Sequence, residues 1–254
     1  MALDLFKITD EGKGLFAVEK ISLLYNLLTS ILIVCLYSEM DHPGQMLIDR
    51  ICLAALTFVL MYLYRLAPCK LTAFVRVAIQ MSLLSYWYPD TFEFNRVFPN
   101  PDRLFASAEQ WLCGGQPAVW FSLRYPQLWV SEALNMGYFC YYPMILVVVV
   151  WYFLNRFDLF EKVSFVVVCG FFIYYLFYIF VPVAGPQFYF PAIGMDKVLQ
   201  GSFPSIGDYF HHHQELLPGP GNAHGFFYSL VEHSQEVGER PTAAFPSSHV
   251  GMST

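Results

Sequence analysis

Long apolar runs separated by short polar segments dominate the first 183 residues. Five of them approach the length of about 20 mostly apolar residues that a helix needs to cross a bilayer. These runs are 21–37, 47–66, 71–88, 133–154 and 163–183. The third is the least apolar, because it carries Arg76, Gln80 and Ser82, with Arg76 within snorkelling reach of one end. The pattern predicts an all-α, polytopic membrane helical bundle with about five spans.

Composition strengthens the membrane interpretation and excludes other classes. Hydrophobic residues make up 56% of the chain and charged residues 13%, whereas a soluble domain carries about 25% charged residues. An aromatic content of 19% argues against disorder. The charge balance argues against nucleic acid as a partner. The chain has 14 basic and 20 acidic residues and a net charge of -6, whereas a protein that binds a phosphate backbone needs an excess of Lys and Arg.

Basic residues in the short loops indicate the orientation. Residues 1–20 are polar and lack the small-residue cleavage site of a secretory signal, so the first run is expected to stay as an anchor. Short basic loops favour the cytoplasm. With the N-terminus inside, the inner segments hold Lys7, Lys13, Lys20, Arg65, Lys70, Arg156 and Lys162. We therefore expect a cytoplasmic segment at 1–20, a transmembrane bundle over 21–183, and the chain after 183 on the outer, extracytoplasmic or lumenal, face.

Two segments of the outer face are not expected to span. Segment 89–132 is too polar to cross but contains Trp111, Trp120 and Trp129, a density typical of helices at the membrane surface. Segment 184–245 is rich in Gly and Pro, which predicts a long extracytoplasmic loop that acts as a lid or binding loop.

Histidines gather in this outer loop, but their spacing does not predict a metal site. His211, His212 and His213 are consecutive, and consecutive histidines rarely converge on one ion. The six cysteines show no Cys-x-x-Cys or Cys/His ligand spacing and are interpreted as structural. We expect no metal and no cofactor, and the role of the three histidines stays open.

The most specific motif is Phe-Pro-Ser-Ser-His-Val-Gly-Met at 245–252. A proline ends the loop, and hydroxyl side chains that can cap a helix follow it. A helix N-terminus offers free N–H groups and a positive dipole end, which suit a phosphate group. His249 on the first turn would then reach a phosphate or leaving-group oxygen. The alternative is an ordinary helix start with a polar histidine at the membrane surface.

This motif resembles the second signature of the type 2 phosphatidic acid phosphatase superfamily, whose usual form is Pro-Ser-Gly-His at the start of a membrane helix on the outer face. Within the superfamily, the chain is most similar to the branch that includes inositol phosphorylceramide synthases. The Pro-rich stretch 181–186 carries that similarity. An upstream segment with Glu109, Gly114, Gly115 and Pro117, and the Tyr- and Pro-bearing stretch 138–143, add weaker support.

The resemblance implies phosphoryl transfer through a covalent phosphohistidine. His249 would be the general acid that protonates the leaving alcohol, and Ser247 and Ser248 with their backbone N–H groups would form part of the phosphate cradle. A helix N-terminus disfavours the imidazolium and a phosphate dianion favours it, so we expect His249 to become charged mainly when substrate is bound.

The chain departs from the usual first and third motifs. The first motif, Lys-x6-Arg-Pro, is represented by Arg240-Pro241 with His233 in the Lys position. We expect Arg240, and secondarily Lys197, to bind phosphate, with a solvated Arg240 paired to Glu239 as the alternative. The third motif, which holds the nucleophilic histidine, is absent. Residues 246–254 would begin a sixth span that needs about 20 residues. We therefore expect a piece of a longer polypeptide that is inactive by itself.

The sequence thus predicts a membrane-embedded lipid phosphate phosphatase or phosphotransferase that acts on a phospholipid or another lipid phosphate. Phe188, Tyr189 and Phe190 are expected to form an acceptor-lipid surface, which mildly favours transfer over hydrolysis. The alternative is a non-enzymatic multispan protein, a transporter or a scaffold subunit. The near absence of ionisable residues within the runs argues against a transporter. Protein partners and oligomeric state are not indicated.

Overall fold

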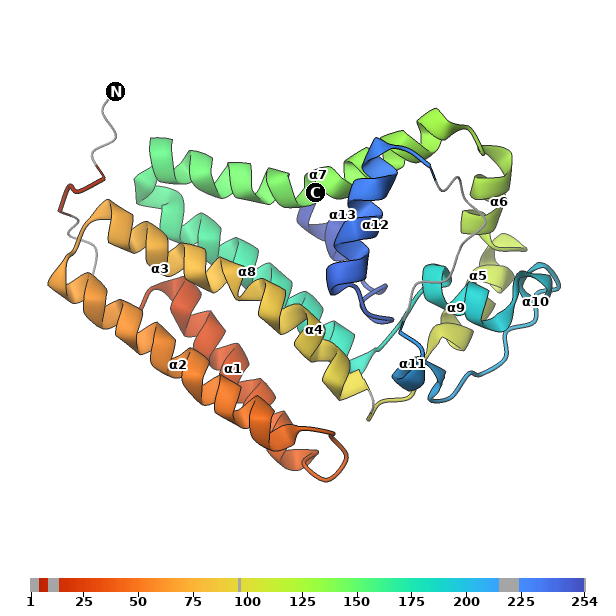
Figure 1. Cartoon of the computed structure of the whole chain (residues 1–254), viewed down its shortest axis with the longest axis horizontal. Coiled ribbons are helices and arrows are strands. Elements are labelled where there is room, and N and C mark those ends of the chain that lie inside the picture. Colours follow the sequence, from red (N-terminus) through yellow and green to blue (C-terminus); the bar gives the residue numbers. More distant parts are fainter. Residues whose placement is uncertain (1–4, 9–13, 96, 215–223, 254) are drawn as a thin grey trace. The chain divides into compact units, whose positions relative to one another are not determined.

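A computed structural model of the chain describes residues 5–8, 14–95, 97–214 and 224–253 (Figure 1). These residues form helices and no strand, with one isolated bridge between Ile8 and Cys69. The predicted all-α class is therefore confirmed. The chain divides into two compact units: unit 1 comprises Met1–Tyr88 and Met144–Ile173, and unit 2 comprises Pro89–Pro143 and Tyr174–Thr254.

Within the described part of the chain, four helices are long and apolar enough to cross a membrane, and the protein is an integral membrane protein. They are α1 (Ala17–Cys35), α2 (Pro43–Leu66), α7 (Leu128–Asn155) and α8 (Phe157–Phe180). They correspond to the first, second, fourth and fifth predicted runs. The third run divides into α3 (Lys70–Ser82) and α4 (Leu84–Asn95) around Leu83. Five spans therefore stay a prediction.

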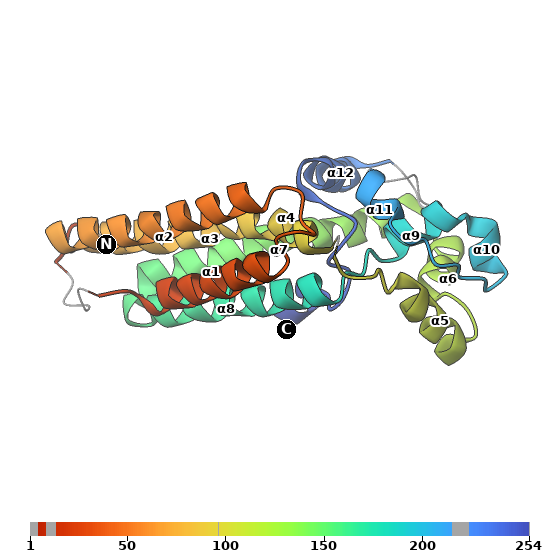
Figure 2. The ribbon, with the colours of Figure 1, turned by 90° about the horizontal axis from the view of Figure 1, so that it is seen from below.

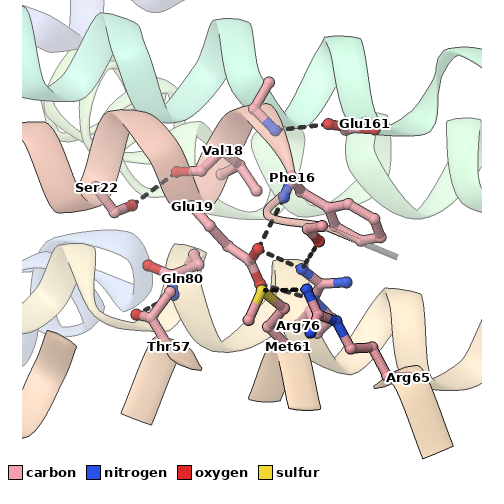
Figure 3. Close-up of polar contacts among 12 residues, drawn as sticks. Phe16, Val18, Glu19, Ser22, Thr57, Met61, Arg65, Arg76, Gln80 and Glu161 are labelled. Carbon is pink, nitrogen blue, oxygen red and sulfur yellow. Dashed lines mark hydrogen bonds and ion pairs between the residues drawn. The ribbon is translucent and has the colours of Figure 1, made fainter. Parts of the chain in front are cut away.

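In unit 1, helices α1, α2 and α3 pack against one another, and both views show them side by side (Figures 1 and 2). Their shared interior contains a buried ion pair (Figure 3). The Nε of Arg76 donates to Oε1 of Glu19 at 2.7 Å, and Nη2 of Arg76 bonds the other carboxylate oxygen. The two side chains are 1% and 0% exposed. Arg76 therefore does not snorkel to the surface.

Further polar side chains line this interior. On α1, the residues spaced three or four apart on one helix face are buried: Glu19, Ser22, Asn26 and Thr29. Gln80 on α3 donates to Thr57 on α2 at 3.0 Å. Arg50 on α2 donates its Nε to Thr29 at 3.3 Å. Polar groups in a membrane interior need such partners. The sequence predicts almost no ionisable residue in the interior of the apolar runs. The structure corrects this expectation, because Arg50 and Arg76 are both buried.

Unit 2 contains mostly short helices. Besides parts of α4, α7 and α8, they are α5 (Asp102–Cys113), α6 (Pro117–Arg124), α9 (Pro186–Ile193), α10 (Met195–Leu199), α11 (Tyr209–His212), α12 (Phe226–Gly238) and α13 (Ser248–Ser253). An apolar core joins α5, α6, α9, α10 and α11, which lie together in both views (Figures 1 and 2).

The segment 184–245 differs from the expected loop, because four of these helices, α9 to α12, lie within it. Proline is compatible with the start of α9: Pro186 lies in the first turn, where the missing N–H has no intrahelical partner to lose. Gly185 precedes it with a φ of 84°, and a Cβ there would lie 2.5 Å from Cβ of Ala244.

The helices of segment 89–132 expose large apolar side chains. On α5, Trp111 is 83% exposed and Leu112 72%, whereas Asp102 and Ala106 on the same helix are buried. On α6, half of the Trp120 surface is exposed. This two-faced character suits a membrane surface, and the interfacial placement stays a prediction.

Candidate active site

The sequence motif at 245–252 forms the predicted helix start. Helix α13 begins at Ser248, and the carbonyl of Ser247 accepts the first helical bond from the N–H of Gly251 at 3.1 Å. The Ser247 hydroxyl accepts a long bond of 3.4 Å from the N–H of Val250. Ser247 therefore occupies the N-cap position, as its residue type predicts.

Tyrosines of α7 and α8 hold the backbone of the motif. The Tyr141 hydroxyl donates to the carbonyl of Ser248 at 3.2 Å, and the Tyr178 hydroxyl donates to the carbonyl of Pro246 at 3.2 Å. Gly251 packs directly against Tyr174, because a Cβ at this position would lie only 1.6 Å from the Tyr174 hydroxyl oxygen. Only glycine fits here without a shift of Tyr174.

The His249 ring lies among three tyrosines of α7. It stacks on Tyr138 with ring centroids 4.1 Å apart and planes at 16°. It is tilted against Tyr141 at 4.2 Å and meets Tyr142 edge-on at 6.0 Å. Its Nε2 is buried and has no hydrogen-bond partner among the described residues.

Burial lowers the pKa of His249 to about 4. The imidazole is therefore neutral at pH 7 when the site is empty. A negative charge bound beside Nε2 would favour the charged form and raise the pKa. This agrees in direction with the expectation that His249 becomes charged with substrate, which stays a prediction.

The predicted phosphate-binding cations make no hydrogen bond with the serines or the histidine of the motif among the residues that the structure describes. Nη1 of Arg240 donates to the backbone carbonyl of Glu239 at 3.3 Å, rather than to its carboxylate. Lys197 is exposed at the C-terminal end of α10. Among the described residues, no hydrogen bond or ion pair joins either cation to Ser247, Ser248 or His249. The structure therefore brings only the serines and the histidine together.

The predicted acceptor-lipid residues are not on a surface. Phe188, Tyr189 and Phe190 are only 3%, 1% and 4% exposed and belong to the apolar core of unit 2. The Tyr189 hydroxyl donates to the carbonyl of Pro204 at 2.7 Å, and burial raises the pKa of this residue to about 12. The sequence placed these aromatic residues in a loop, whereas helix formation by α9 turns them into core.

The three consecutive histidines are on or next to α11. His212 lies 3.8 Å from a carboxylate oxygen of Asp208, with both side chains exposed. The ring of His213 stacks on Tyr209 at 4.2 Å. Within the described ranges, no three His, Cys, Asp or Glu side chains are grouped as metal ligands.

Two carboxylates that sequence analysis did not single out organise unit 2. Glu132 of α7 accepts from the N–H groups of Phe227 and Tyr228 at 3.0 and 2.9 Å, and so caps α12. Asp102 of α5 accepts from the N–H groups of Ala184 and Gly185 at 2.9 and 2.7 Å. Burial raises the pKa of Asp102, and the two backbone N–H groups oppose this.

Contacts near Asp102 also position the segment of chain that leads into the 245–252 motif. The N–H of Ala244 donates to the carbonyl of Val183 at 2.9 Å, next to the residues that Asp102 holds. Thr242 and Asn95 are both buried and bonded to each other through their side chains. None of these pairs is detectable from sequence, because the partners lie at least 60 residues apart and form no local pattern.

Comparison with known proteins identifies the family. A family model described as the PAP2 superfamily matches residues 103–254, which is more than half of the chain and includes the whole 245–252 motif. The searches of curated proteins and of solved structures found no significant match. Residues 1–102, with the Glu19–Arg76 pair, lie outside the matched range. The chain therefore belongs to the type 2 phosphatidic acid phosphatase (PAP2) superfamily.

Proposed function

We propose that this protein is a membrane enzyme that transfers a phosphoryl group from a phospholipid or another lipid phosphate to water or to an alcohol. The observation that carries this proposal is the buried Nε2 of His249, which lacks a hydrogen-bond partner among the described residues and lies in the motif that the family model covers. Buried polar atoms are normally bonded, so an unbonded one at the start of a helix suits a ligand.

In the proposed reaction, His249 acts as general acid and then as general base. A nucleophilic histidine of the kind that the third motif carries forms the N–P bond while the P–O bond to the leaving alcohol breaks. His249 gives its proton to that oxygen. Water or an acceptor alcohol then attacks phosphorus, His249 takes the proton of the attacking hydroxyl, and the N–P bond breaks.

The phosphate group is assigned to Ser247, Ser248 and Arg240, with Lys197 as a second cation. Arg240 is next to the buried Pro241 and Thr242, so its backbone is well supported. Its single bond to a neutral carbonyl at 3.3 Å is weak compared with a bidentate bond to phosphate. The Arg240 guanidinium therefore loses little if it exchanges this bond for one to a phosphate.

The outer-face location is also a proposal, and two native cysteines on opposite sides test it. Cys113 ends the interfacial α5 on the proposed outer side, and Cys69 precedes α3 on the proposed cytoplasmic side. Variants that keep only one of the two are treated in intact cells with a membrane-impermeant thiol reagent. If only Cys113 is labelled, the proposed orientation is supported. If only Cys69 is labelled, the orientation is the reverse of the proposed one.

The activity is tested with the complete gene product, a phospholipid, and either no acceptor or a ceramide or diacylglycerol acceptor. New acceptor phospholipid identifies a transferase. Free phosphate that does not respond to the acceptor identifies a phosphatase. Failure to produce either product from any lipid phosphate would contradict the proposal.

A transporter is the second candidate, and the buried Arg50 and Arg76 of unit 1 are the observation that favours it, because ionisable residues inside membrane bundles often mark transport pathways. The close pairing of Arg76 with Glu19 supports a structural role instead. Lipid or ion flux in vesicles without phosphate turnover would favour the transporter.

A further inference from the structure

The three tyrosines around His249 are not equivalent. The Tyr141 hydroxyl is occupied by the carbonyl of Ser248, and Tyr142 meets the imidazole edge-on at 6.0 Å. Tyr138 alone among the three is parallel to the imidazole within stacking distance. A flat stack fixes the plane of the His249 ring and therefore the direction in which Nε2 points.

The stack also has an electrostatic consequence. The face of a tyrosine ring attracts a cation, and such contacts contribute about 0.5–2 kcal/mol. An imidazolium is a cation and a neutral imidazole is not. The Tyr138 ring at 4.1 Å therefore favours the protonated form of His249, in opposition to burial, which favours the neutral form.

Tyr138 interacts with Gln235 of α12 and with Glu239, the residue that follows α12. The side chain of Gln235 interacts with both the Tyr138 hydroxyl and the Glu239 carboxyl. Oε1 of Glu239 accepts from Gln187 at the start of α9. Its Oε2 is buried and has no hydrogen bond among the described residues. The carboxyl of Glu239 thus connects α9, α12 and, through Gln235, the Tyr138 ring.

We propose that Tyr138 is a positioning residue for His249, and that Gln235 and Glu239 act on His249 through Tyr138. The Tyr138 ring orients the imidazole and stabilises its charged form, while the polar pair holds the Tyr138 hydroxyl. This inference rests on the proposed function, since it assigns His249 the role of an acid. The other ionisable groups nearby are Tyr141 and Tyr142 of α7, Tyr174 and Tyr178 of α8, and Arg240 beside Glu239.

The experiment compares Tyr138→Leu and Tyr138→Phe with wild type in the complete gene product. We measure kcat and KM for lipid phosphate turnover as functions of pH. Tyr138→Leu removes the stack and is expected to lower kcat about 2- to 30-fold, the range that corresponds to the cation–ring energy. It should also move the alkaline limit of kcat to lower pH and leave KM within about 2-fold of wild type. Tyr138→Phe keeps the ring and should lose less than about 3-fold.

Tyr142→Leu is the matched control, because it removes a ring of the same size from the same helix without removing a stack. It should leave the alkaline limit of kcat in place. Equal pH profiles for Tyr138→Leu and Tyr142→Leu would overturn the positioning role. If the wild-type protein turns over lipid phosphate and His249→Ala does not, the proposed function stands even though the positioning role of Tyr138 fails. Absence of wild-type turnover would instead contradict the function itself.

A double-mutant cycle tests the action of Glu239 through Tyr138, and it does not depend on the folding of Tyr138→Leu. Glu239→Gln keeps an acceptor for Gln187 and removes the charge. If Glu239 acts through the Tyr138 hydroxyl, adding Glu239→Gln to Tyr138→Phe should lower kcat by less than about 1.5-fold more. Independent, multiplying losses would overturn this part of the proposal.

Discussion

Unit 1 buries Glu19 and Arg76 fully, whereas unit 2 holds Glu239 and His249 in partly buried positions, and the two sets differ in what else they contact. In unit 1, both Glu19 oxygens are bonded to Arg76, and one also accepts from the N–H of Phe16 at 2.8 Å. The Arg76 guanidinium lies 3.8 Å from the Phe16 ring centroid. In unit 2, Glu239 and His249 each keep one buried polar atom without a hydrogen bond among the described residues.

The difference separates a structural from a functional arrangement of ionisable side chains. Arg76 leaves Nη1 without a hydrogen bond, but its charge is balanced at close range by Glu19, so the pair is closed to a further charged partner. Among the described residues, no hydrogen bond or ion pair joins His249 or Glu239 to a group of opposite charge. In the motif that the PAP2 family model covers, the unbonded Nε2 of His249 suits a bound phosphate. The same contrast predicts that substitutions in unit 1 affect stability and those near His249 affect turnover.

The largest expected effect is on turnover in His249→Ala. General acid–base groups contribute about 10²- to 10⁴-fold, so phosphate release or transfer should fall by that factor. Membrane insertion should be normal, because three tyrosines and Ser247 hold the rest of the motif. Turnover is measured in detergent or vesicles with insertion checked by fractionation. Unchanged turnover would remove His249 from the mechanism.

Separation of the unit 1 pair should have the next largest effect, on stability. Glu19→Ala or Arg76→Ala leaves a buried charge unpaired, which costs about 3–5 kcal/mol. Thermal unfolding in detergent should show a large loss for each single variant, and Glu19→Leu with Arg76→Met should recover much of it. Arg156→Ala is the control, since its ion pair with Asp158 is more than half exposed and such surface pairs contribute little to stability. Equal, small losses at all three positions would contradict a structural role for the buried pair.

A smaller, local effect is expected at the start of α12. Glu132→Ala removes the carboxylate that accepts from Phe227 and Tyr228, and loss of this cap should loosen the first turn of α12. Amide hydrogen exchange at Phe227 and Tyr228 should become faster while exchange in α2 is unchanged. Glu232→Ala on the exposed side of the same helix serves as the comparison. Protection that survives in Glu132→Ala would show that packing, rather than this cap, holds the helix.

A further effect appears only at acidic pH, in the contribution of His249 to stability. Its pKa falls from an ordinary 6.5 to about 4 in the folded site, so between these values the unfolded chain binds more protons. This contribution is therefore fully present above pH 6.5 and is lost as the pH falls toward 4. His249→Gln should flatten the unfolding profile of the empty protein between these pH values. A profile identical to wild type would show that His249 does not titrate abnormally.

Local features of this chain were predictable from sequence, and distant contacts were not. The apolar runs at 21–37 and 47–66 became α1 and α2 because length and hydropathy are local properties. The cap at Ser247 follows equally from residue type. Pairing of Glu19 with Arg76 joins residues 57 positions apart and leaves no periodic signal. Phe188 was misplaced on a surface because aromatic residues between prolines resemble a loop, and only the packing of α9 shows that they are core.

The central claim, that His249 protonates the leaving group, is tested most directly by changing that group. Turnover of wild type and His249→Ala is compared for a lipid phosphate with an ordinary alcohol leaving group and for a p-nitrophenyl phosphate ester, whose leaving group needs little protonation. If His249 is the general acid, the variant should lose about 10²- to 10⁴-fold with the alcohol and far less with p-nitrophenol. Equal losses with both substrates would contradict the claim.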